Sequence, residues 1–144
     1  MEIKDVIEFM IKSHGDQKYG DLPFCVHPIL VARHFSNKEL KTIALLHDVV
    51  EDTDVTIQKI KELFGDVVAE AIDAISRREN EKYLEEYIPR VYKNNLAKKV
   101  KSADLEENIH SARYCYPEYE NLIKRYEKAL EMFWILDLEN QENQ

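Results

Sequence analysis

The sequence predicts an all-helical protein. Glycine and proline are scarce, with three and four among 144 residues, and so are the alternating apolar runs that mark half-buried strands. Apolar residues recur instead at the spacing of an amphipathic helix, as near the N-terminus in Ile3, Val6, Ile7, Met10 and Ile11. A third observation is the segment 43–54, IALLHDVVEDTD, in which an apolar helical start leads without a turn residue into histidine and acidic residues.

Length and composition describe one folded domain. A chain of 144 residues can bury roughly two-thirds of its unfolded surface. A content of 44% hydrophobic and 33% charged residues is typical of folded soluble proteins. We expect the domain to span residues 1–138, and the polar residues 139–144 to form a disordered tail.

The formal net charge of −8 excludes some partners. We expect no binding to nucleic acid polymers or to anionic membranes. A small anionic substrate stays compatible, because a metal ion and a few lysines can reverse the local field. No apolar run is long enough to cross a membrane. The two cysteines have no metal-binding spacing, so we expect reduced thiols and a cytoplasmic location.

Capping residues and prolines predict the element boundaries of the first half. The first helix is expected to end near Ser13, and the segment 16–26 should be an irregular loop. Because proline is favoured in the first turn of a helix, Pro28 places His27 at the entrance of the second helix. A third helix is expected over residues 38–52.

The second half is also predicted to be helical. Asn37 and Thr56 are the expected N-caps of the third and fourth helices. Pro89 should disturb the charged segment 76–94 unless it lies in the first turn of a new helix. The remaining helices are expected over residues 56–64, over 96–114 and from Pro117 onward. Another helix is expected to begin near residue 66, and its apolar positions continue to Ile75.

Four side chains are candidate metal ligands, namely His27, His47, Asp48 and Asp104. Imidazole and carboxylate together suit a divalent ion such as Mn²⁺, Fe²⁺ or Mg²⁺, and the absence of thiolates argues against a structural zinc site. Each signal alone has an ordinary explanation, since a His-Pro pair commonly just starts a helix and Asp104 fits an exposed acidic face. The combination points to a metal site, because buried carboxylates are costly unless they are paired or bound to a metal.

Glu51 and Asp52 are candidate catalytic acids. On a continuous helix Glu51 lies one turn beyond His47, and Asp52 one turn beyond Asp48, so the four share one side. A metal makes a bound water more acidic, and nearby carboxylates could orient that water, remove its proton or protonate a leaving oxygen. The alternative is a solvated helix end.

A further group of polar residues surrounds Asp104. Asn108 and Ser111 are its i+4 and i+7 neighbours, and Lys101 borders the same face. An acid, an amide, a hydroxyl and an ammonium suit a phosphorylated, hydroxyl-rich ligand. Lys101 and Arg77 could form a rim that draws in a polyphosphate; the alternative for both is an ordinary solvated surface.

Three segments, HPILVA, ALLHDVVEDTDVT and KVKSADLEEN, resemble the HD-domain metal-dependent phosphohydrolases. The resemblance is to the RelA/SpoT-type branch with its small alarmone hydrolases, and it covers about residues 10–135. It implies an HD-type bundle of about seven or eight helices around one Mn²⁺ ion, held by the four candidate ligands. Members of this family remove pyrophosphate from the 3′ position of guanosine tetra- or pentaphosphate by attack of a metal-activated water.

The resemblance also implies roles for individual residues. Glu51 and Asp52 would be the catalytic acids, and Asn108 and Ser111 would lie near the nucleotide sugar and phosphates. The family's loop before the His-Pro pair often carries an arginine that stacks on guanine, and the nearest counterpart here is Lys18. A lysine keeps the charge but lacks the planar surface.

The function expected first is therefore Mn-dependent hydrolysis of guanosine-3′,5′-bis(diphosphate). Two alternatives stay open: an HD hydrolase of another phosphorylated nucleotide, such as a nucleoside monophosphate or a dinucleotide 2′-phosphate, and a catalytically silent nucleotide-binding module. The apolar final helix could cover the core or form the contact of a homodimer.

Overall fold

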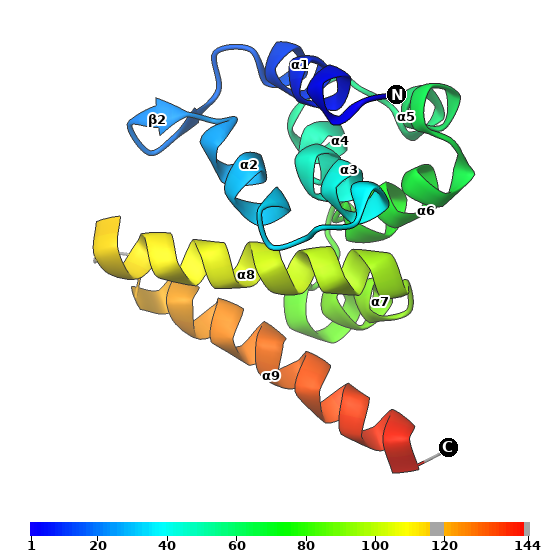
Figure 1. The fold of residues 1–144 in the computed structure, drawn as a ribbon. Helices are drawn as coiled ribbons and strands as arrows, with labels where there is room; N and C mark the ends of the chain where they lie inside the picture. Colours follow the sequence, from blue (N-terminus) through cyan, green and yellow to red (C-terminus); the bar gives the residue numbers. More distant parts are fainter. Residues whose placement is uncertain (116–119, 143–144) are drawn as a thin grey trace.

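The computed structural model describes residues 1–115 and 120–142, and within them the all-helical prediction is confirmed (Figure 1). A π-helical turn covers Tyr83–Tyr87, and a short antiparallel hairpin pairs β1 (Lys18–Tyr19) with β2 (Leu22–Pro23). The helices are α1 (Ile3–His14), α2 (Val26–Ala32), α3 (Lys38–Leu46), α4 (Val49–Asp52), α5 (Ile57–Phe64), α6 (Asp66–Ile75), α7 (Ile88–Tyr92), α8 (Asn95–Cys115) and α9 (Glu120–Glu142).

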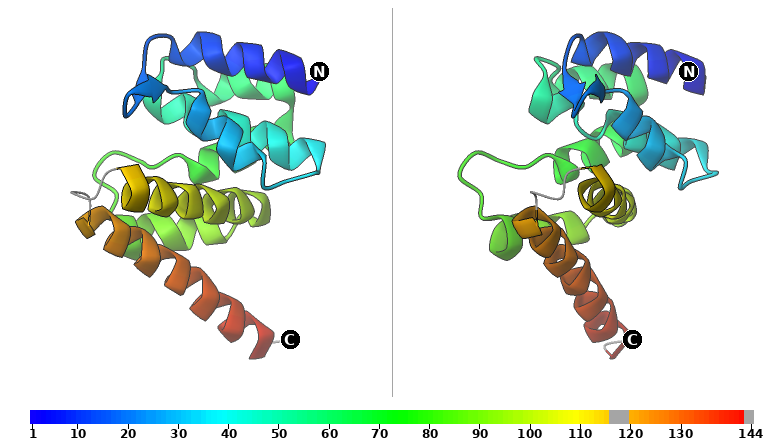
Figure 2. Two further views of the ribbon diagram at one scale, coloured as in Figure 1. Left: turned by 60° about the vertical axis from the view of Figure 1, so that its left-hand side comes forward. Right: turned by 90° about the vertical axis from the view of Figure 1, so that its left-hand side faces the viewer.

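Helix α8 separates two groups of helices. Helices α1 to α6 lie on one side of it and α7 and α9 on the other, an arrangement that the views of Figure 2 repeat. Helix α8 packs against α2, α3, α6, α7 and α9. A side chain on α8 can therefore meet residues that are far away in the sequence.

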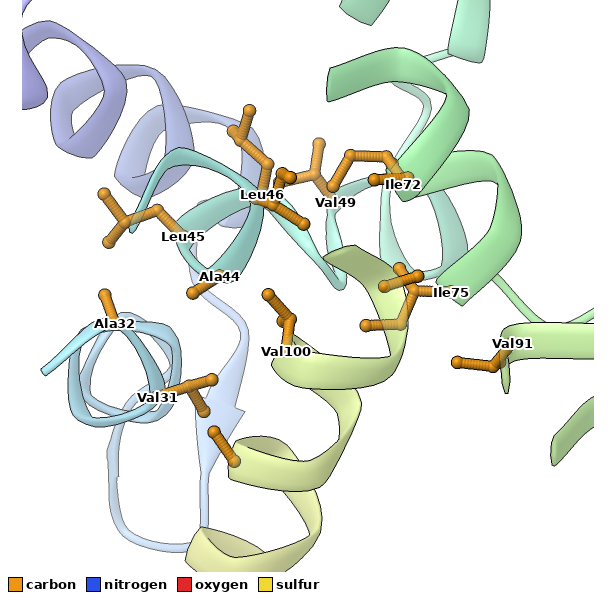
Figure 3. Packing of buried hydrophobic residues seen from close by; sticks show 14 of the residues in the cluster. Val31, Ala32, Ala44, Leu45, Leu46, Val49, Ile72, Ile75, Val91 and Val100 are labelled. Atoms are coloured by element: carbon orange, nitrogen blue, oxygen red, sulfur yellow. The ribbon is translucent and has the colours of Figure 1, made fainter. Parts of the chain in front are cut away.

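The core lies where α3 and α6 meet α8 (Figure 3). Ala44, Leu46, Ile72 and Val100 have no solvent exposure there. Helix α3 is apolar over four consecutive residues because other helices surround it on several sides. This burial supplies most of the free energy that holds the helices together.

Helix α9 covers the core with one of its two adjacent aromatic residues. Phe133 is 1% exposed, whereas Trp134 is 61% exposed. The C-terminal part of α9 extends away from the other helices (Figure 1). The homodimer contact expected for this helix stays a prediction. None of the described helices is long and apolar enough to cross a bilayer.

The predicted capping residues are confirmed at two helices. The Oδ1 atom of Asn37 accepts the N–H of Leu40 at 2.9 Å, and the Oγ1 atom of Thr56 accepts the N–H of Lys59 at 3.1 Å. Pro89 lies in the first turn of α7, directly after the π-helical turn, where its missing N–H costs little.

The helix predicted over 38–52 is wrong in one respect, because it breaks at His47 and Asp48. The Nδ1 atom of His47 lies 2.6 Å from the carbonyl oxygen of Ala44. In an unbroken helix that carbonyl would accept the N–H of Asp48. The imidazole therefore competes with the helix for its acceptor, as short polar side chains also do.

Two further segments differ from the prediction. The loop 16–26 contains the hairpin, whose turn places Gly20 at a φ of 62°. Helix α9 continues to Glu142, so residues 139–142 are helical and do not belong to a disordered tail. Pro117, the predicted start of the last helix, lies outside the described residues.

An ion pair fastens the segment 76–82, which follows α6, to α7. The guanidinium of Arg90 donates to both carboxylate oxygens of Glu81, at 2.8 and 2.9 Å, and also to the carbonyl of Ala74 at 2.9 Å. The side chain of Glu81 is 11% exposed. The hydrogen bonds from Arg90 lower the pKa of Glu81 to about 2.

We predict that Phe133→Ala lowers the free energy of unfolding by about 3–5 kcal/mol, because it removes a buried aromatic ring and leaves a cavity. Trp134→Ala, the matched control at the next residue, should change it by about 0.5 kcal/mol or less. Urea denaturation of both variants is the measurement. Equal losses would contradict the packing described for α9.

We also predict a pH-dependent effect of Glu81→Gln. Because the pKa of Glu81 is lower in the folded than in the unfolded chain, its ionisation stabilises the fold above the ordinary pKa of 4.5. This stabilisation is lost as the pH falls toward about 2. Wild type and variant should therefore differ in denaturation midpoint near neutral pH and converge in acid, and a difference that is constant with pH would refute the ion pair.

Candidate metal centre

The four predicted ligands come from three parts of the chain and meet in the structure. His27 lies in the first turn of α2, His47 and Asp48 form the break between α3 and α4, and Asp104 lies on α8. The Nε2 atoms of His27 and His47 lie 2.7 and 3.2 Å from Oδ1 of Asp104. The Nε2 atom of His47 also lies 3.1 Å from Oδ2 of Asp48.

The imidazole of His47 has a defined tautomer. Its Nδ1 faces the carbonyl of Ala44, which can only accept, so Nδ1 carries a proton. In the neutral ring the lone pair of Nε2 is then directed at the cluster, as a metal ligand requires. His27 also directs Nε2 at Asp104, while its Nδ1 is buried with no hydrogen-bond partner among the described residues.

The electrostatics of the cluster favour positive charge. Burial opposes the charged form of His47, but the carboxylates of Asp48 and Asp104 raise the pKa of this imidazole well above its ordinary value. Burial also opposes the charged form of Asp104. The ammonium of Lys101, 3.0 Å from Oδ2, and the imidazole of His47 nevertheless hold the pKa of Asp104 well below its usual range.

The donor set fits a divalent cation. His27, His47 and Asp104 are all buried and offer ligand atoms within 4.8 Å of one another. Asp48 borders this group, and its side chain is 23% exposed, so the cluster is accessible from that side. Imidazole nitrogen and carboxylate oxygen are ligands that divalent transition metals accept. The cluster could therefore hold a metal ion.

Glu51 and Asp52 lie at the end of α4, and each accepts a hydrogen bond from a different segment. A carboxylate oxygen of Glu51 accepts the backbone N–H of Arg77. An oxygen of Asp52 accepts the side-chain amide of Gln17 at 3.0 Å. Both residues are exposed on one side, but the protein atoms around their carboxyl groups displace water and raise the pKa of each, and the negative charge of Asp48 raises it further.

A cavity of 240 Å³ adjoins the cluster and is called here the cluster cavity. Three cations, Arg77, Lys101 and Arg125, are among its lining residues, together with Glu51 and Asn108. Of the residues predicted to contact a substrate, Arg77, Lys101 and Asn108 thus lie at the cluster. The other lining residues are Tyr19, Phe24, His27, Asp48, Tyr83, Tyr87, Asp104 and Tyr126.

A second cavity, of 180 Å³, shares Tyr19, Asn108 and Tyr126 with the first. Ser111, also predicted to contact a substrate, lines this second cavity. Lys18 is exposed on β1 and is not among the residues that line either cavity.

Tyr19, the residue after Lys18, lines both cavities, which Lys18 does not. Its ring stacks on His27 with 4.7 Å between centroids, and its hydroxyl donates to Oδ1 of Asn108 at 2.9 Å. Burial raises the pKa of this hydroxyl to about 12, so it stays protonated and able to donate.

Sequence reasoning missed Tyr19, Arg125 and Tyr126. The guanidinium of Arg125 lies 3.7 Å from the centroid of the Tyr83 ring, and its Nε is buried without a hydrogen-bond partner in the described part of the chain. The adjacent basic and aromatic residues of α9 were a signal, but the rotation of α9 about its axis relative to α8 cannot be derived from spacing alone.

Comparisons with known proteins give relatives of one kind. No family model matches the chain. It is 33% identical over 129 residues to guanosine-3′,5′-bis(diphosphate) 3′-pyrophosphohydrolase MESH1 of Danio rerio, covering 79% of this chain and 71% of that protein. It is 38% identical over 91 residues to the guanosine-3′,5′-bis(diphosphate) 3′-pyrophosphohydrolase of Aquifex aeolicus, covering 59% of this chain but only 13% of that longer protein.

A solved structure supports the fold. It is described as a metazoan ortholog of SpoT that hydrolyses ppGpp, and it matches with a TM-score of 0.76 and 20% identity over 91% of this chain and 84% of that chain. The identity to MESH1, over most of both sequences, extends the likeness from fold to sequence. This chain therefore belongs to the HD-domain family of ppGpp hydrolases that includes MESH1 and the SpoT-type enzymes.

Proposed function

We propose that this chain hydrolyses guanosine-3′,5′-bis(diphosphate) and releases pyrophosphate from its 3′ position. The observation that carries the proposal is the cluster cavity, where the buried His/His/Asp cluster meets Arg77, Lys101 and Arg125. A metal-binding cluster beside three cations suits a substrate with several phosphates. The names of the relatives in Danio rerio and Aquifex aeolicus support the same substrate.

The ion is proposed to be Mn²⁺, with Fe²⁺ and Mg²⁺ as alternatives, held by His27, His47, Asp48 and Asp104. Such an ion, when bound, makes a coordinated water more acidic and polarises a phosphoryl oxygen. Lys101 contacts Oδ2 of Asp104, whereas both imidazoles face Oδ1. Lys101 would thus orient the carboxylate, leaving Oδ1 on the side of the two imidazoles as a ligand atom for the ion.

Hydrolysis forms a bond from the water oxygen to the phosphorus attached to O3′ and breaks the bond between that phosphorus and O3′. One proton leaves the water, and one must reach O3′. We assign this transfer to Glu51, which lines the cluster cavity and has one oxygen held by the N–H of Arg77. The loss of water around its carboxyl group raises the pKa of Glu51 above its ordinary value, which is the direction that favours a proton carrier. Asp52 is assigned as the second catalytic acid.

The substrate contacts follow from the lining of the two cavities. Arg77 and Lys101 in the cluster cavity are proposed to attract the phosphates. Asn108, shared by both cavities, and Ser111 in the second are proposed to face the sugar and its phosphates. The role proposed for Lys18 gains no support from its exposed position.

A second candidate is hydrolysis of another phosphorylated nucleotide at the same site. It is favoured by Tyr19, which lines both cavities in the loop where the family often carries an arginine, and which offers a hydroxyl but no charge. A nucleoside monophosphate and a dinucleotide 2′-phosphate are the comparison substrates.

The proposal predicts turnover by the purified, Mn²⁺-loaded protein. Guanosine tetraphosphate should yield GDP and pyrophosphate, resolved by chromatography, and a chelator should stop the reaction until Mn²⁺ is restored. Release of neither product, with the metal shown to be bound, would refute the substrate. Turnover of a comparison substrate alone would then favour the second candidate.

Glu51→Gln should lower kcat by about 10²–10⁴-fold, the range typical of a lost general acid or base. The amide keeps the shape of the side chain, so bound metal and denaturation midpoint should be unchanged. Glu70→Gln, at an exposed position on α6, is the matched control and should match wild type. Unchanged turnover in Glu51→Gln with the metal in place would remove the role given to Glu51.

A further inference from the structure

A chain of hydrogen bonds connects the end of α1 with Asp52. The Nδ1 atom of His14 lies 2.9 Å from Oε1 of Gln17, and Nε2 of Gln17 donates to Oδ2 of Asp52 at 3.0 Å. Neither His14 nor Gln17 lines the cluster cavity. Asp52 does not line this cavity either, but it follows the candidate ligand Asp48 by one helical turn. His14 and Gln17 are thus connected to the cluster through Asp52 and α4.

The chemistry of the three groups fixes the direction of this chain. An ionised carboxylate can only accept, so the amide of Gln17 must turn its NH₂ group to Asp52. Its oxygen then faces His14, whose Nδ1 must donate. The amide is held at both ends and cannot flip without losing both contacts.

The backbone fixes the two side chains in place. Helix α1 ends at His14, and the following Gly15 adopts a φ of 55°, which a residue with a side chain rarely does. The N–H of Gln17 then donates to the carbonyl of His14, and the carbonyl of Gln17 accepts the N–H of Phe24, both at 3.1 Å. The turn after α1 thus presents Gln17 to the end of α4.

The imidazole of His14 contacts Gln17 through Nδ1, but burying its other nitrogen lowers the stability of the fold. Its side chain is buried, its ring lies 4.3 Å from that of Phe24, and its Nε2 has no hydrogen-bond partner among the described residues. An unpaired buried nitrogen is unfavourable, and a phenylalanine would fill similar space without one. The polar contact that offsets this cost is the one to Gln17.

We propose that Gln17, held by His14, is a positioning residue that fixes the carboxylate of Asp52 for the hydrolytic reaction. The inference rests on the proposed function, in which Asp52 is a catalytic acid. Asp52 follows Asp48 by one helical turn, and its N–H donates to the carbonyl of Asp48 at 3.0 Å. With one oxygen tied to Gln17, the other keeps a constant direction relative to the metal ligands.

The test compares Gln17→Leu and His14→Phe with wild type in steady-state turnover of guanosine tetraphosphate by the Mn²⁺-loaded protein. Gln17→Leu should lower kcat by about 10- to 100-fold, as expected when a reacting group is misplaced, and leave KM within a factor of about two to three, since Gln17 touches no substrate. His14→Phe should lower kcat less, because the amide keeps its bond to Asp52. The His14→Phe substitution should not lower the denaturation midpoint, and this separates a positioning role from a merely structural one.

Gln58→Leu, the same substitution on the exposed face of α5, is the matched control and should match wild type.

A kcat of Gln17→Leu equal to that of wild type would overturn the inference, and so would a rise in KM alone. If wild type does not hydrolyse the nucleotide, the proposed function fails, and the contact is tested by NMR instead. The side-chain amide protons of Gln17 should then shift in Asp52→Asn while those of Gln58 stay in place. Unshifted Gln17 signals would refute the contact itself.

Discussion

The burial of one carboxylate, that of Asp104, is the constraint on which the rest of the site depends. Asp104 is 3% exposed and lies in the middle of α8, which packs against α2, α3, α6, α7 and α9. A charge buried in this way is tolerated only with partners, and these are His27, His47 and Lys101, from α2, the α3–α4 break and α8 itself. The same contacts that stabilise the carboxylate of Asp104 therefore bring the candidate metal ligands to one point.

The helix break at His47 and Asp48 gives the site its second feature. The break lets His47 bond to the carbonyl of Ala44 and aim its other nitrogen at Asp104. It also places the short helix α4 so that Glu51 meets the segment fastened by Arg90. The flanking acids are thus held from outside the candidate metal ligands, by the turn after α1 and by the segment after α6.

Much of this arrangement could be predicted from the sequence, because apolar residues recur at helical spacing and residues with distinctive chemistry mark the helix ends and the site. The caps at Asn37 and Thr56 and the place of Pro89 depend on local geometry that spacing reports directly. The candidate metal ligands were identifiable because their combination points to a metal site, although each residue alone has an ordinary explanation. Spacing does not show that the imidazole of His47 competes with the helix for a carbonyl acceptor. It also does not show that Tyr19, and not Lys18, lines the cavity, or that the rotation of α9 brings Arg125 to the site. Each of these depends on contacts between segments far apart in the chain.

The most direct test of the account is calorimetric titration of the metal-free protein with Mn²⁺. If the cluster around Asp104 is a metal centre, wild type binds one ion per chain, and Asp48→Asn, which leaves the buried pair of Asp104 and Lys101 intact, binds it about 10- to 100-fold more weakly or worse. Binding of no ion by the folded wild-type protein, or equal binding by both proteins, would contradict the assignment of the cluster as a metal centre.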